Sequence, residues 1–138
     1  MKLTGGCYCG TIRYEAQGEP MFRLQCHCRE CQYITGGSPN VVMGMPADGF
    51  RYSQGEPRAF ARPDLPAPVS REFCPHCGTH LLTRSPRVPG AVLLKVGTLD
   101  TPEAFGRPAL AIFTRDMQAF HHVPDDIPAH AARPGSYD

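Results

Sequence analysis

The residues CPHCG at positions 74–78 form a Cys-x-x-Cys pair closed by a glycine. This pattern is the usual half of a structural zinc site, which takes four ligands. Cys7 and Cys9 supply a matching pair, because residues i and i+2 of a strand point to the same side. Cys7, Cys9, Cys74 and Cys77 therefore predict a closed zinc site that ties the start of the chain to its middle. A redox dithiol at 74–78 is the alternative, although no βαβ pattern surrounds that pair.

The seven cysteines fall into three clusters, and the remaining cluster is Cys26, Cys28 and Cys31. An odd number excludes a framework of disulfides complete within one chain. No apolar stretch follows the first residues as it would in a secretory signal, so we expect a cytoplasmic protein with reduced thiols. Clustered cysteines in that setting indicate metal binding or catalysis.

Composition favours one globular domain, since the 138 residues are 41% hydrophobic and 20% charged. The formal net charge is +1 and no basic block occurs, so nucleic acid and membrane surfaces have no electrostatic support as partners. No apolar run is long enough to cross a membrane. The 15 prolines and 14 glycines favour short strands and turns over long helices.

Hydrophobic alternation predicts a mainly β domain. In residues 11–16, for example, Ile12, Tyr14 and Ala16 alternate with polar residues. Short helical turns are expected at 29–34 and 102–105. We expect a domain over residues 1–120 and a polar tail, disordered in part, over 121–138. The expected strands are 11–16, 21–26, 41–45, 50–53, 58–62, 69–74, 80–84, 91–99 and 109–115.

Cys26, Cys28 and Cys31 lack a fourth ligand, and three protein ligands with an open position are the usual form of a catalytic zinc site. His27 lies between two of them, but an extended segment points it away, so we expect a surface histidine or one that supports the ligands. We expect none of the other histidines to be a ligand. His76 should be exposed, His121 and His122 should be solvated, and His80 and His130 should have no metal role.

Four motifs carry a resemblance to a known family: TGGCYCGTIRYEAQGEP (4–20), CHCRECQ (26–32) followed by TGG, FCPHCGTHL (73–81) and KVGTLD (95–100). Together they resemble the glutathione-dependent formaldehyde-activating enzymes, a family that includes centromere protein V. The resemblance runs from about residue 3 to about residue 116. It implies a single-domain, zinc-stabilised, β-tent-like fold of short antiparallel strands.

The resemblance also implies site roles and an activity. Cys7, Cys9, Cys74 and Cys77 would hold a structural zinc, and the triad Cys26, Cys28 and Cys31 would hold a second, labile zinc, which is easily emptied. The family's activity is the addition of formaldehyde to glutathione, which gives S-hydroxymethylglutathione and is classed as a carbon–sulfur lyase reaction.

Charge arithmetic at the triad agrees with a thiol partner. Three thiolates and Zn²⁺ leave a net charge of −1, and such a soft site prefers a sulfur as its fourth ligand. A substrate thiol such as glutathione would be held as the nucleophilic thiolate and would attack a small aldehyde. The sequence identifies no acid for the resulting alkoxide. Arg29, Arg71 and Arg84 lie near the clusters in sequence, but none is singled out as an anchor. The alternative is a non-catalytic zinc scaffold that binds a protein partner.

Overall fold

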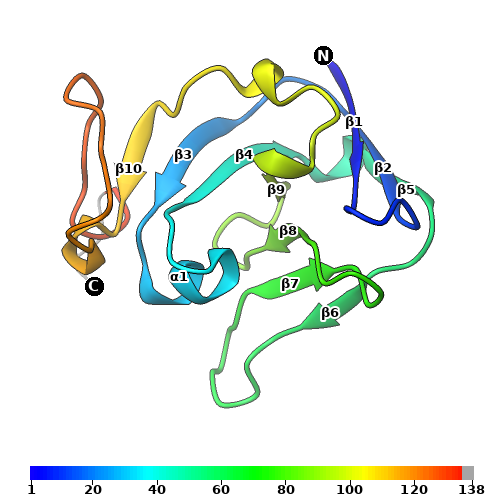
Figure 1. The fold of residues 1–138 in the computed structure, drawn as a ribbon, viewed down its shortest axis with the longest axis horizontal. Coiled ribbons are helices and arrows are strands. Elements are labelled where there is room, and N and C mark those ends of the chain that lie inside the picture. The colour runs from blue at the N-terminus through cyan, green and yellow to red at the C-terminus, as the bar shows by residue number, and fades with distance from the viewer. Residues whose placement is uncertain (135–138) are drawn as a thin grey trace.

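Two β-sheets of unequal size make up the protein, in a computed structural model that describes residues 1–134 (Figure 1). The smaller sheet has the strand order β1-β2-β5. The larger sheet has seven strands in the order β10-β3-β4-β9-β8-β7-β6. The strands are β1 (Lys2–Gly6), β2 (Arg13–Gln17), β3 (Phe22–Cys26), β4 (Asn40–Pro46), β5 (Phe50–Gln54), β6 (Arg58–Phe60), β7 (Ser70–Phe73), β8 (His80–Arg84), β9 (Ala91–Lys95) and β10 (Leu110–Ile112).

Helical structure is confined to short segments. The α-helix α1 (Arg29–Thr35) follows β3. The 3-10 turns are η1 (Ala47–Gly49), η2 (Val96–Thr98), η3 (Pro102–Phe105) and η4 (Thr114–Asp116). The prediction of a mainly β, single-domain protein is confirmed. Within residues 1–134, no helix is long and apolar enough to span a membrane.

The core lies between the two sheets. Tyr14 and Ala16 of β2 are buried in alternation with more exposed neighbours. They belong to one hydrophobic cluster with Met43, Met45 and Leu94 of the larger sheet. Position 5, opposite Tyr14 in the β1–β2 pair, requires a glycine, because a Cβ atom there would lie 2.4 Å from both the Thr98 carbonyl oxygen and the Tyr14 hydroxyl oxygen. That hydroxyl bonds instead to the Thr98 hydroxyl at 2.7 Å.

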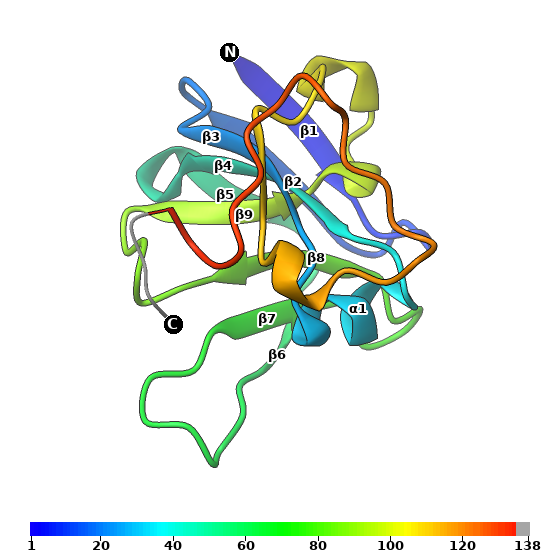
Figure 2. The same cartoon turned by 90° about the vertical axis from the view of Figure 1, so that its left-hand side faces the viewer.

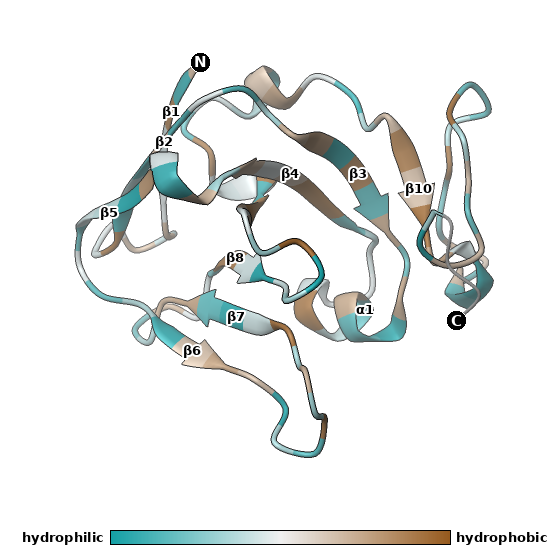
Figure 3. Cartoon of the chain, turned by 180° about the vertical axis from the view of Figure 1, so that it is seen from behind, coloured by the Kyte–Doolittle hydropathy of each residue, from teal (hydrophilic) through white to brown (hydrophobic). Residues whose placement is uncertain are grey.

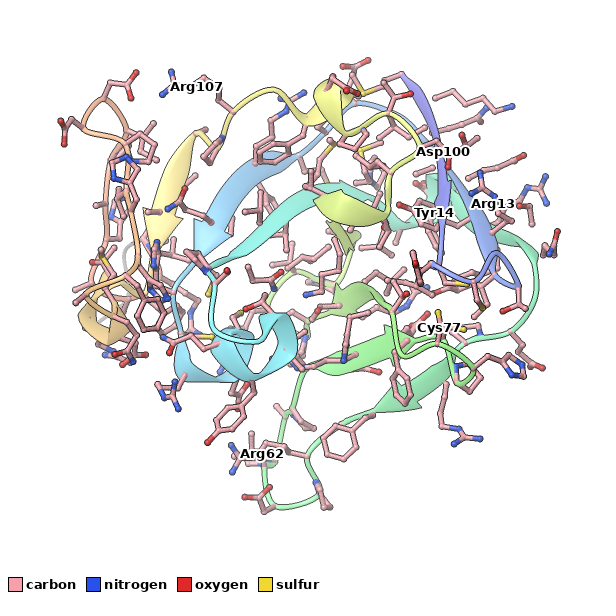
Figure 4. The ribbon with its side chains drawn as sticks, in the orientation of Figure 1. Arg13, Tyr14, Arg62, Cys77, Asp100 and Arg107 are labelled. Carbon is pink, nitrogen blue, oxygen red and sulfur yellow. The ribbon has the colours of Figure 1, made fainter. Side chains whose placement is uncertain are left out.

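The smaller sheet is also tied to the η2–η3 region at its edge. Figure 4 shows Arg13 and Asp100 side by side near Tyr14, and the Arg13 guanidinium donates to the Asp100 carboxylate at 2.9 Å. Asp100 also accepts a 2.7 Å hydrogen bond from Thr4. These bonds lower the pKa of Asp100, mainly through Arg13.

The larger sheet corrects the expectation that all the strands are antiparallel. All its pairings are antiparallel except that of β10 with β3, which is parallel. A parallel pair requires a crossover connection between its two strands. Here the connection from β3 to β10 contains all the strands from β4 to β9. Several expected strands are also shorter than predicted: 91–99 ends at Lys95, where η2 begins, 109–115 ends at Ile112 before η4, and 58–62 ends at Phe60. The strand β1 was not among the predicted ranges.

The chain beyond η4 folds back along β10, as the orange-to-red segment in Figure 2 shows. Ala129 forms a parallel bridge with Ala111, and the His130 amide donates to the Ala111 carbonyl at 2.9 Å. Ala132 is buried. The part of the expected tail at 135–138 lies outside the described residues.

Candidate functional site

The four cysteines at 7, 9, 74 and 77 converge, since their sulfur atoms all lie within 4.8 Å of one another. The Cys7 and Cys9 sulfurs are 3.6 Å apart, and the Cys9 and Cys74 sulfurs are 3.8 Å apart. Sulfurs at the corners of a tetrahedron with zinc–sulfur bonds of ~2.3 Å are about 3.8 Å apart. These residues therefore fit a closed zinc site.

Two tight turns bring these sulfurs together. Cys7 and Cys9 lie in the turn between β1 and β2, not in a strand as expected. The Gly10 amide donates to the Cys7 carbonyl at 3.1 Å, and the positive φ of 83° at Gly10 explains the glycine there. In the β7–β8 turn, the Gly78 amide donates in the same way to the Cys74 carbonyl at 2.9 Å.

Backbone and hydroxyl donors favour the thiolate forms that zinc binds. Burial, the largest influence, would raise the pKa of Cys7, but hydrogen bonds from the Ile12 amide and the Thr11 hydroxyl outweigh it and lower the pKa to about 7. Hydrogen bonds from Thr79 lower the pKa of Cys77 to about 5. Figure 4 shows Cys77 near other sulfur atoms at the meeting of the two turns. A zinc here would join the smaller sheet to the larger one.

The second cluster forms where β3 passes into α1. Cys26 is the last residue of β3, and Cys28 is the N-cap of α1, where its sulfur accepts from the Cys31 amide at 3.3 Å. The helix ends at Gly36 with a left-handed φ of 80°. The three sulfurs lie within 4.8 Å of one another, so strand end, cap and first helical turn aim them at one point.

The three thiols change one another's pKa values. Hydrogen bonds from Cys26 and Cys28 lower the pKa of Cys31, and the Asn40 amide and the charge of Lys95 lower it further. The pKa of Cys26 rises because it hydrogen-bonds to Cys28 and Cys31. A bound cation would favour the thiolate form of all three. This donor set fits zinc.

A cavity of about 860 Å³ opens beside these three cysteines. Its wall is one face of the larger sheet, because residues directly opposite each other in paired strands share a face. Thus Leu24 lies opposite Val42 in the β3–β4 pair and opposite Leu110 in the β10–β3 pair. Figure 3 shows the alternation of hydrophobic and hydrophilic residues along β3. The apolar part of the wall consists of Phe22, Leu24, Val42, Leu93, Leu110 and Ile112.

The same face carries polar groups that the sequence analysis did not single out. Lys95 lies opposite Val42, and Thr83 lies opposite Leu93. The Lys95 ammonium donates to the Thr83 hydroxyl oxygen at 3.1 Å, and both residues are buried. Burial lowers the pKa of Lys95 to about 8, while the neighbouring Cys31 opposes this shift. In the sequence, Lys95 could have been noticed because it ends the otherwise apolar run AVLLK (91–95).

His27 and His121 are both more buried than surface histidines, which leaves for His27 the other expectation, a residue that supports the ligands. His27 is fully buried, so it is not a surface residue. Its Nδ1 lies 3.0 Å from Nδ1 of His121, and its Nε2 lies 3.0 Å from the Gln25 amide nitrogen. His121, expected to be solvated, is half-buried and donates from Nε2 to the Gly37 carbonyl at 2.7 Å. The pair joins the segments before and after α1 to the C-terminal segment. His76 is exposed.

Of the three arginines near the clusters in sequence, two line the cavity. Arg71 is buried and pairs with Glu30 at 3.2 Å. Arg29 also lies on the rim and rests over the Tyr33 ring. Arg84 instead pairs with Glu72 at 2.6 Å and does not line the cavity. Arg87 is an exposed cation on the same rim.

Two comparisons of the sequence with known proteins point to one family, and a comparison of structures shows a shared fold. The sequence profile of the glutathione-dependent formaldehyde-activating enzymes matches residues 2–116. A protein from Halomonas elongata, provisionally named as such an enzyme, is 27% identical over 97 residues. The match covers 67% of this chain and 62% of that relative, so the chain matches less than two thirds of the relative's length. A crystal structure of a Rhodobacter sphaeroides protein shares the fold, with a TM-score of 0.63, 15% identity and coverage of 92% of this chain and 99% of the other.

Proposed function

The chain belongs to the family of glutathione-dependent formaldehyde-activating enzymes, and we propose that it catalyses the reversible addition of a small thiol to an aldehyde, as a carbon–sulfur lyase. Glutathione and formaldehyde, which give S-hydroxymethylglutathione, are the substrates that the family suggests. The observation that carries this proposal is the convergence of Cys26, Cys28 and Cys31 beside a cavity of about 860 Å³.

The two clusters have different roles in this proposal. Cys7, Cys9, Cys74 and Cys77 hold a structural zinc, because four thiolates leave no position for a substrate. Cys26, Cys28 and Cys31, which line the cavity, would hold a labile zinc with three protein ligands and so leave a fourth position for a substrate thiol. Reduced thiols at both sites require a reducing compartment, so we place the protein in the cytoplasm.

The domain assignment is also part of the proposal. Residues 1–120 form the zinc-binding domain, of which the family profile matches 2–116. The C-terminal segment is an addition to it, and its described part contributes Arg133 and Pro134 to the cavity.

When bound at the three-cysteine cluster, zinc would supply the positive charge that keeps a substrate thiol deprotonated near neutral pH. The protein positions the reactants. Asn40 donates to the Cys31 sulfur at 3.5 Å and fixes that side chain. The apolar sheet face excludes water around the reacting carbonyl carbon. Rim cations such as Arg87 can attract the carboxylates of an anionic thiol.

The addition balances without a redox partner. The thiol loses a proton, its sulfur bonds to the aldehyde carbon, and the π electrons of the C=O bond move to the oxygen. That oxygen then takes up a proton, so the sum of thiol and aldehyde equals the hydroxyalkyl thioether. The reverse sequence is the lyase reaction.

The rival function is a non-catalytic zinc scaffold for a protein partner. A scaffold has no requirement for a cavity beside a three-ligand cluster, and this feature favours the enzyme. X-ray absorption on the zinc-loaded protein separates the two, with glutathione and S-methylglutathione as matched ligands. We expect glutathione to raise the mean number of sulfurs per zinc from 3.5 toward 4, since the two sites contribute four and three sulfurs. We expect no such rise with the S-methyl compound. Equal spectra for the two ligands would favour the scaffold.

A further inference from the structure

Addition of a thiol to an aldehyde develops negative charge on the carbonyl oxygen, and this charge needs a donor. The largest single contribution in such reactions is usually a preorganised hydrogen bond to the oxyanion. Cysteine thiolates cannot supply it, since they are acceptors. A donor must therefore face the cavity, within reach of a carbonyl carbon held beside the three sulfurs.

Thr83 is a hydrogen-bond donor that lines this cavity. It is buried, it lines the same cavity as Cys26, Cys28 and Cys31, and it sits on the same sheet face as the apolar wall. Within the described chain, 1–134, its hydroxyl takes part in one hydrogen bond, in which it accepts from the Lys95 ammonium at 3.1 Å. An ammonium has only donors, so it cannot take the hydroxyl proton. The Lys95 bond thus directs that proton away from the Lys95 ammonium.

Lys95 adds charge as well as orientation. Its electrostatic interactions include all three cysteines of the cluster. Three thiolates with zinc carry −1, and the Lys95 ammonium brings the sum to zero. A buried positive charge behind the Thr83 oxygen makes its O–H a stronger donor, because hydrogen bonds with an ionised partner polarise the next bond in the chain.

We propose that the Thr83 hydroxyl is the catalytic hydrogen-bond donor to the aldehyde oxygen, and that Lys95 is the positioning residue that holds it. This inference rests on the proposed function. As the C–S bond forms and the C=O π bond breaks, the Thr83 proton stabilises the alkoxide, which then takes its proton from water at the cavity mouth. In the lyase direction, the same bond stabilises the alkoxide before the C–S bond breaks.

The test compares Thr83→Val, which has the same shape without a hydroxyl, with Thr83→Ser, which keeps the hydroxyl. Exchange NMR with ¹³C-formaldehyde and glutathione measures the rate of adduct formation above the uncatalysed rate. We expect Thr83→Val to lower kcat by about 100-fold, as loss of one oxyanion donor does, with unchanged zinc content and thiol affinity. Thr83→Ser should stay within a few-fold of the parent. Lys95→Met should lower kcat by about tenfold at unchanged glutathione affinity.

A second readout is independent of turnover. Calorimetry measures the binding of S-(2-hydroxyethyl)glutathione relative to its isostere S-propylglutathione. The parent should prefer the hydroxyl compound about three- to tenfold, the worth of one net hydrogen bond, and Thr83→Val should lose that preference. If Thr83→Val keeps the parental kcat and the parental ligand preference, the assignment of Thr83 is wrong, while the proposed function is unaffected. A parent protein that accelerates no adduct formation overturns the proposed function, and this inference with it.

Discussion

Loss of the four-cysteine site should destabilise the whole fold, and the structure gives the size of the effect. Zinc held by Cys9 and Cys74 would cross-link residues that lie 65 apart in the sequence, in turns that join strands of different sheets. In the chain-entropy model, a cross-link closing a loop of that length stabilises a protein by about 4 kcal/mol. Total stabilities are roughly 5–15 kcal/mol. Cys74→Ser should therefore remove a large part of the stability.

The control is Cys28→Ser, because the three-cysteine cluster spans only residues 26–31. The same relation gives about 2 kcal/mol for so short a loop. For a domain of this size, 1 kcal/mol corresponds to roughly 4 °C in Tm. We expect a fall of roughly 15 °C in Tm for Cys74→Ser and about half of that for Cys28→Ser.

Circular dichroism melts, run on samples whose zinc is counted by mass spectrometry, measure this difference. Each variant should lose one zinc per chain. Cys9→Ser provides a check, since Cys9 is exposed and its loss leaves no hydroxyl in the core. Its Tm should fall with that of Cys74→Ser. Equal shifts for the two clusters, or a Cys74→Ser protein that keeps both its zinc and its Tm, would refute the assignment of the structural site.

Two further changes test the packing around the site. Tyr14→Phe should cost about 1 kcal/mol at pH 8, since its hydroxyl makes a partly buried 2.7 Å hydrogen bond. Burial raises the pKa of Tyr14 to about 12, above the unfolded value of about 10. The folded state keeps a proton that the unfolded chain releases, so the free energy of unfolding falls as the pH rises from 10 to 12. Urea titrations should show a smaller fall of this free energy in Tyr14→Phe than in the parent. Gly44→Ala should cost ~1–3 kcal/mol, because its Cβ would lie 2.4 Å from the Phe22 ring, which lines the cavity. Gly97→Ala, whose Cβ meets nothing within 4 Å, should unfold at the parental urea concentration, and equal midpoints for the two glycine variants would contradict the packing argument.

Local chemistry in the sequence was enough to predict the fold class and to group the cysteines. Two pairs and a triplet of cysteines can be matched to zinc by counting ligands, because zinc demands four and the spacings within each cluster are short. Alternation of apolar residues likewise indicates strands such as β3 and β4 without any knowledge of their neighbours.

Only the tertiary structure decided which strands are neighbours. Alternation shows which residues of one strand share a face, but it does not give the order of strands in a sheet. The parallel entry of β10 beside β3, and the register that sets Val42 opposite Lys95, both follow from that order. The cavity wall and the Lys95–Thr83 hydrogen bond are built from segments that are distant in sequence. Their contact depends on how the whole chain packs, which is why the triad could be predicted from its own residues while its surroundings could not.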